Sequence, residues 1–93
     1  MSPRHPGKIL ADDFMYPSAL SARALAASMD VPTTRVTRLL NGTNGMTADT
    51  ALRLEEYFGI PAARWCDMQR DYDLALAREK RGARSWQDNG RRV

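Results

Sequence analysis

Threonine hydroxyls and arginine guanidinium groups are concentrated in residues 31–42, VPTTRVTRLLNG, and no acidic residue lies between positions 31 and 48. Read as a helix of about 3.6 residues per turn, the segment turns its apolar side chains to one side and leaves the polar ones exposed. An arginine can donate two hydrogen bonds to a guanine edge, and a threonine can contact a base or a thymine methyl group. The segment therefore predicts a surface for the base edges of double-stranded DNA, whereas the alternative is that each arginine pairs with a nearby carboxylate. The side chains expected at base edges are Thr33, Thr34, Arg35, Thr37 and Arg38.

Two short helices joined by a tight turn are predicted to present this surface. The first spans residues 21–29 with Ser21 as its N-cap, and the second spans residues 32–41. Ala26 supplies the small residue that a close helix crossing needs, and Val36 supplies a branched residue buried after the turn. Such a helix-turn-helix places its second helix in the major groove while the first abuts the phosphate backbone. The side chains expected near phosphates are Ser21, Arg23, Asn41 and Thr47.

Proline, glycine and apolar spacing divide the rest of the chain into three more helices. One is expected over residues 6–16, one over residues 47–59 and one from residue 61 to about residue 81. No window shows the sustained alternation of apolar and polar residues that a strand needs. The predicted fold class is therefore an all-α, five-helix domain.

The last of these helices carries a long apolar stripe for so small a domain. Core packing is the plainer interpretation, but part of the stripe is expected to face a second copy of the chain or another protein. Residues 1–82 would then form the DNA-binding domain with a C-terminal dimerisation helix, and residues 83–93 a flexible basic tail in which only Trp86 is a candidate for docking. The stripe consists of Trp65, Met68, Tyr72, Ala75 and Leu76, and all of these except Ala75 are candidates for the partner surface. The stripe of the preceding helix consists of Ala51, Leu54, Tyr57 and Phe58.

The net charge of +3 is distributed unevenly along the chain. Residues 31–48 carry +2, residues 49–77 carry −3 and residues 78–93 carry +4. A positive window inside the fold and a positive tail fit a polyanionic ligand. For the tail, a solvated chain end is nearly as good an explanation.

Catalytic and metal chemistry find little support in the composition. Cys66 is the one cysteine and His5 the one histidine, so neither a disulfide nor a zinc-ligand set is expected within the chain. We expect His5 to be a surface residue and Cys66 to be at least half-buried. Because no nucleophile has a base nearby, neither an enzyme nor a bound cofactor is expected. The N-terminus lacks the apolar core of a signal peptide and no apolar run could span a bilayer, which predicts a cytoplasmic protein without a membrane partner.

Three blocks of the sequence are more specific than the helix-turn-helix alone. They are HPG-x-I-L near the start, NG-x-x-G-x-T-A-D-T-A-L-R-L over residues 41–54, and W-x-x-x-Q-x-x-Y-D-L-x-x-A over residues 65–77. Together they resemble the HigA/VapI-type antitoxins, a branch of the Xre/Cro-like, lambda-repressor-like family of helix-turn-helix proteins. The resemblance covers about residues 5–80.

This resemblance implies a homodimer that binds a palindromic operator and represses its own operon. It also implies a partner, a HigB-like toxin of the RelE type that cleaves mRNA. Two positions depart from the family pattern: Asp30 stands where glycine is usual in the turn, and Ala22 stands where glutamine is common, which shifts a phosphate contact to Arg23. An orphan Xre-type repressor and a protein-binding module with vestigial DNA binding are the alternatives.

Overall fold

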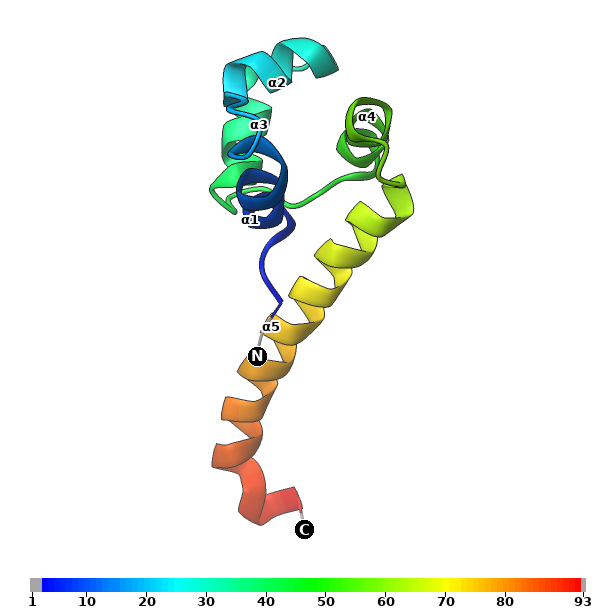
Figure 1. The fold of residues 1–93 in the computed structure, drawn as a ribbon. Coiled ribbons are helices and arrows are strands. Elements are labelled where there is room, and N and C mark those ends of the chain that lie inside the picture. The colour runs from blue at the N-terminus through cyan, green and yellow to red at the C-terminus, as the bar shows by residue number, and fades with distance from the viewer. Residues whose placement is uncertain (1–2, 93) are drawn as a thin grey trace.

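The computed structural model describes the backbone of residues 3–92 and the side chains of residues 3–82. Within this range every regular element is a helix, and η1 continues α1 directly, so the predicted all-α fold of five helices is confirmed. Figure 1 shows α2 and α3 together at one end, α4 beside them, and α5 running away from the bundle. The elements are α1 (Pro6–Ile9), the π-helix η1 (Leu10–Met15), α2 (Ala22–Met29), α3 (Thr33–Leu40), α4 (Ala48–Phe58) and α5 (Ala62–Arg92).

Local side-chain chemistry defines the ends of α2 and α4 as the sequence predicts. The Ser21 hydroxyl accepts a hydrogen bond from the backbone N–H of Ala24 at 3.0 Å, and the Thr47 hydroxyl accepts one from Thr50 at 3.2 Å. Asp30 ends α2 in the left-handed region, with φ 58° and ψ 48°. Aspartate tolerates this conformation better than most residues, which explains how the turn forms without the usual glycine.

The first helix changes from α-helical to wider π-helical turns in η1, where it contacts the core. The backbone N–H of Tyr16 bonds to the carbonyl of Ala11 at 2.9 Å, which is the i→i+5 spacing of a π-helix. In an α-helix, residues five positions apart point about 140° away from each other. The wider turns bring Leu10 and Met15 to the same side, and both side chains are buried.

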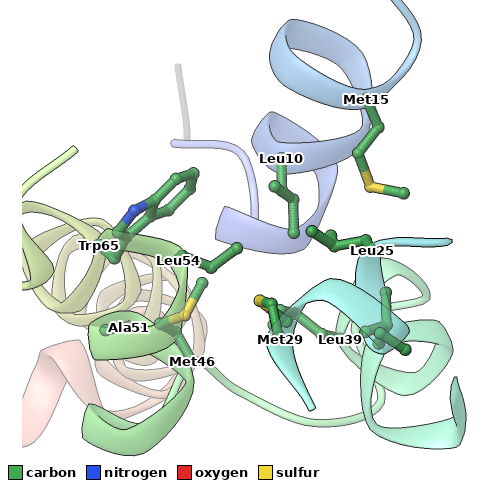
Figure 2. Close-up of a cluster of buried hydrophobic side chains, with 11 residues drawn as sticks. Leu10, Met15, Leu25, Met29, Leu39, Met46, Ala51, Leu54 and Trp65 are labelled. Carbon is green, nitrogen blue, oxygen red and sulfur yellow. The ribbon is translucent and has the colours of Figure 1, made fainter. Parts of the chain in front are cut away.

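One hydrophobic core joins η1, α2, α3, α4 and α5 (Figure 2). Figure 2 shows Trp65 of α5 beside Leu54 of α4, and Leu10 of η1 close to Leu25 of α2. Trp65 is completely buried, so its assignment to a partner surface is wrong. The indole fills the core, and its ring centroid lies 5.4 Å from that of Phe14 in a tilted arrangement.

The stripe predicted on α4 needs a second correction. Tyr57 is 43% exposed, whereas Thr50 is buried in the first turn of the helix. The reason is that the helix presents Thr50, Ala51 and Leu54 to the core, and this leaves the Tyr57 ring at the rim against Phe58.

Helix α5 is longer than the sequence predicts. It passes through Gly82 and ends at Arg92 instead of near Arg81. The protruding rod makes the molecule 54 Å long and 22 Å wide, with a radius of gyration of 16.2 Å, against about 12 Å for a compact chain of this length. The predictions for the tail side chains and Trp86 fall outside the described side chains. Among the described residues no helix has the length and apolar character to cross a bilayer.

Candidate DNA-binding surface

The crossing of α2 and α3 is built as the sequence predicts. Ala26 and Val36 are each 1% exposed, so the two helix axes approach over a small side chain and a branched one. This packing directs the opposite side of α3 to solvent. Thr33, Thr34, Arg35 and Arg38 are exposed there, and the fifth candidate, Thr37, is half-buried.

Thr37 is less available to a ligand than the other candidates. Its hydroxyl donates a hydrogen bond to the Thr34 carbonyl at 3.2 Å, within the same helix. A threonine that bonds back to its own helix is a common way to satisfy a partly buried hydroxyl. The methyl group and the two oxygen lone pairs are what Thr37 can still offer to a neighbouring molecule.

Arg35 has an acidic partner, although no acidic residue lies between positions 31 and 48. The absence of acids from that window therefore does not leave this arginine unpaired. Its Nη1 donates to Asp49 Oδ2 at 2.6 Å, and Arg53 Nε donates to the same oxygen at 3.0 Å. Asp49 lies one residue beyond the window 31–48, and the fold returns it to α3 at the start of α4. Hydrogen bonds from Arg53 and then Arg35 lower the pKa of the Asp49 carboxyl, so it is ionised at neutral pH.

The expected phosphate contacts are all exposed, but they differ in what they already bind. The hydroxyls of Ser21 and Thr47 serve as helix N-caps, and Thr47 also donates to the Thr50 hydroxyl at 3.1 Å. Arg23 takes part in no ion pair within residues 3–82. Asn41 is the C-cap of α3 and starts the loop that leads to Thr47.

A groove separates α3 from the beginning of α4. Its volume is about 570 Å³, and both polar and charged groups border it. The groove brings base-edge and phosphate candidates from different elements to one surface. Its lining consists of Arg35, Leu39, Thr43, Asn44, Gly45, Thr47, Asp49 and Thr50.

Helix α5 holds the loop between α3 and α4, and the sequence reasoning assigned this role to no residue. Gln69 Oε1 accepts a hydrogen bond from the backbone N–H of Met46 at 2.6 Å, and Gln69 Nε2 donates to Asp73 at 3.0 Å. At the other end of the loop, the N–H groups of Thr43 and Asn44 bond to the Arg38 carbonyl. The available signal was that this glutamine is a polar residue at the helical spacing of the apolar stripe, four residues after Trp65 and three before Tyr72.

His5 is half-buried and not the freely exposed terminal residue expected from the sequence. Its Nδ1 accepts a hydrogen bond from the Gly7 N–H at 2.9 Å and caps α1, and its ring meets Tyr72 edge to face at 4.9 Å. Burial lowers the pKa of the imidazole, and the charge of Asp73 partly opposes this shift. The HPG block thus fastens the first helix to α5.

The proposed partner surface on α5 is only partly open. Met68 and Tyr72 are half-buried, with Met68 packed against the core and Tyr72 against His5. Leu76 is 39% exposed and is the most accessible of the four residues expected there. Cys66 is half-buried, as expected.

The fold and this surface together define a helix-turn-helix protein of the Xre/Cro-like class. No protein-family model matches the chain. The structure superposes on an addiction module antidote protein of the HigA family from Coxiella burnetii with a TM-score of 0.84 and 42% identity, over 95% of this chain and 96% of that one. It superposes on the Pseudomonas aeruginosa antitoxin HigA, solved with the higBA promoter, with a TM-score of 0.80 and 33% identity, over 98% and 95% of the two chains.

A sequence relative gives the same result. Virulence-associated protein I of Dichelobacter nodosus is 45% identical over 75 residues, which are 81% of this chain and 69% of that protein. The chain belongs to the HigA family of antitoxins.

Proposed function

We propose that this protein is the antitoxin of a type II toxin-antitoxin pair and represses its own operon as a sequence-specific DNA-binding dimer. The observation that carries the proposal is the exposed polar side of α3, held by the buried Ala26 and Val36 contact on its other side. Support also comes from the P. aeruginosa relative, which was solved with promoter DNA. A helix of about 10 Å diameter with exposed threonines and arginines fits the major groove.

In this proposal α3 reads base edges and its neighbours hold phosphates. Arg35 and Arg38 bind guanine, while Thr33, Thr34 and Thr37 contact bases or thymine methyl groups. The phosphate contacts come from Ser21, Arg23, Asn41 and Thr47, which position the protein without specifying sequence. Two α3 helices related by a two-fold axis would meet half-sites about 34–36 Å apart, so the operator is an inverted repeat.

The partners of the proposed antitoxin are a second copy of the chain and a HigB-like toxin of the RelE type, in the cytoplasm. Support for the toxin is the family membership, since relatives carry the names antitoxin and addiction module antidote protein. Support for a dimer through α5 is the length of the helix and the exposure of Leu76.

A salt titration with two DNA duplexes tests the DNA-binding part. Fluorescence anisotropy compares the gene's own upstream region with scrambled DNA of equal length. A preference of about 10³ or more for the upstream region, saturating at two chains per inverted repeat, supports a specific repressor. Equal and steeply salt-dependent affinity for both duplexes would contradict it.

Co-expression tests the toxin part separately. The adjacent reading frame is induced alone and then together with this chain, and growth and mRNA integrity are followed. Growth arrest with mRNA cleavage, relieved by this chain, supports an antitoxin. A neighbour that is harmless when induced alone would favour an orphan repressor.

A further inference from the structure

Arg35 and Arg38, the two arginines of the proposed reading helix α3, differ in their ion pairs. Arg35 is bound to Asp49 at 2.6 Å, whereas Arg38 takes part in no ion pair among residues 3–82. The Asp49 pairing uses Nη1 of Arg35 and leaves the N–H groups on Nε and Nη2 without a hydrogen-bond partner among the described residues. A guanidinium held by one corner can still present two donors to a base.

Asp49 is itself held in position by a second arginine, Arg53. Arg53 donates to Asp49 through Nε at 3.0 Å and, through Nη1, to the Met29 carbonyl at 2.6 Å. Met29 is the last residue of α2, immediately before the turn of the helix-turn-helix. The series Met29, Arg53, Asp49 and Arg35 therefore connects the end of α2 through α4 to the first turn of α3.

Fixing a long side chain before binding lowers the entropy that binding must remove. An arginine has many rotamers, and immobilising it at an interface opposes association. A charge-assisted hydrogen bond is shorter and stronger than a neutral one, so Asp49 restricts these rotamers in the unbound protein. Asp49 also repels DNA phosphates, and this sequence-independent cost falls on every duplex alike.

We infer that Asp49 is a specificity-determining positioning residue, which holds Arg35 for a single base of each operator half-site, with Arg53 as its support. This inference rests on the proposed function of α3 as the reading helix. The opposite possibility is that Asp49 only neutralises Arg35 and lowers affinity for all DNA.

Asp49→Asn separates the two possibilities, and Asp67→Asn is its matched control. Both carboxylates are 58% exposed and belong to surface ion pairs, but Asp67 pairs with Arg70 on α5. Each variant removes one negative charge, but only Asp49 borders the groove beside α3, so its loss raises sequence-independent affinity more. The ratio of operator affinity to scrambled-DNA affinity cancels this effect. Thermal melting of both variants verifies that the fold is intact, because Asp49 lies in the first turn of α4, where a negative charge stabilises a helix.

Affinities for the operator, for scrambled DNA, and for operators with each base pair changed in turn give a profile of preference along the half-site. We expect Asp49→Asn to lower the preference for operator over scrambled DNA about fivefold or more relative to Asp67→Asn, as a displaced guanine contact would. The lost preference should fall on the base pair that Arg35→Ala also affects, and Arg38→Ala should affect another. Combining Arg35→Ala with Asp49→Asn should lower preference no further than Arg35→Ala alone.

Two results would overturn the inference while leaving the proposed function standing. One is an unchanged base profile in Asp49→Asn, with affinities for operator and scrambled DNA raised equally. The other is a loss of preference in Asp49→Asn that adds fully to that of Arg35→Ala. A parent protein without preference for its upstream DNA would instead overturn the proposed function, and this inference with it.

Discussion

At the scale of single residues, the arginines of the candidate surface fall into two kinds. Arg35 is bound to a carboxylate from α4, whereas Arg23 and Arg38 take part in no ion pair among residues 3–82. The sequence contains the acid that pairs with Arg35, but only the reversal of the chain between α3 and α4 brings it there. Linear charge windows cannot detect such a pair, because they end at a residue number and not at a distance.

Arg23→Ala and Arg38→Ala should weaken DNA binding in different ways. Arg23 follows the N-cap of α2, where a phosphate is expected, so its loss should weaken binding to all duplexes and reduce the salt slope by about one unit. In our proposal Arg38 faces the major groove of the DNA, so its loss should reduce the discrimination between the operator and its base variants by about 1–3 kcal/mol. Anisotropy titrations at several salt concentrations measure both quantities. Unchanged affinity and preference in Arg38→Ala would mean that α3 does not enter the major groove of the DNA.

The half-buried imidazole of His5 should make stability depend on pH. The folded protein lowers the pKa of His5 from its ordinary value of 6.5, because burial disfavours the charged ring. The unfolded chain therefore binds the proton more readily, so the free energy of unfolding is fully retained above pH 6.5 and decreases as the pH falls below it. Protonation also removes the Nδ1 lone pair that accepts the Gly7 N–H.

Urea unfolding of the parent and of His5→Asn between about pH 8 and pH 5 tests this prediction. Asparagine is also a good N-cap, so it retains an acceptor for the Gly7 N–H but cannot titrate. We expect the variant to be less stable overall, since it loses the ring contact with Tyr72, but to show a flatter stability curve near pH 6. Identical slopes in both proteins would show that His5 does not cause the pH dependence.

At the scale of elements, caps and periodicity explain why most of the fold could be predicted. Ser21 and Thr47 accept N–H bonds where the sequence places them, and the contact of Ala26 with Val36 follows from helical spacing and size alone. These are local or pairwise properties, so one sequence is enough to predict them. The π turns of η1 and the continuation of α5 beyond Gly82 were missed.

The missed features depend on contacts between distant segments. Trp65 has the spacing of a surface stripe and of a core stripe equally, and only the packing of the first helix and α4 over α5 decides that it is buried. The sequence marks Gln69 only as a polar residue within an apolar stripe, and its partner could not be predicted because the N–H that it binds lies 23 residues away. For the candidate site, residue types could be predicted from α3, but the partners that restrain them could not.

Close contact between the first helix and α3 makes Gly7 sensitive to substitution. A Cβ atom on Gly7 would lie 1.8 Å from the Leu39 carbonyl oxygen, which belongs to the backbone and cannot rotate away. Gly7→Ala should therefore lower the free energy of unfolding by about 3 kcal/mol. Gly82→Ala is the matched control, because Gly82 is helical and has no atom within 4 Å of a built Cβ.

Chemical denaturation distinguishes the two glycine variants. Gly82→Ala should leave stability unchanged or raise it by up to about 1 kcal/mol, since alanine is the better helix former. Equal stability of Gly7→Ala and the parent would mean that the first helix can move away from α3 without cost.

At the scale of the whole molecule, α5 gives the protein its elongated shape. The first turns of this helix are packed against the core, whereas side chains further along it are exposed. Its first turns bury Trp65 and hold the loop beside α3, whereas further along the chain Leu74 and Leu76 are 42% and 39% exposed. These two leucines are two positions apart, which places them about 160° from each other around the helix. A two-fold interface along α5 would bury one side of the helix, so it should distinguish between them.

Leu76→Glu should therefore convert the proposed dimer to a monomer, and Leu74→Glu should leave it intact. Each dimer contains two copies of the substitution, so the lost apolar burial alone costs about 3 kcal/mol or more. That corresponds to a dissociation constant raised by about a hundredfold or more. Sedimentation velocity at several protein concentrations measures the constant, and anisotropy with operators of altered half-site spacing measures the consequence. A monomer should bind single half-sites and lose its preference for the natural spacing, because only a dimer fixes the distance between two α3 helices. Dissociation by Leu74→Glu alone would place the interface on the other side of α5, and dimers that resist both substitutions would place it outside this helix face.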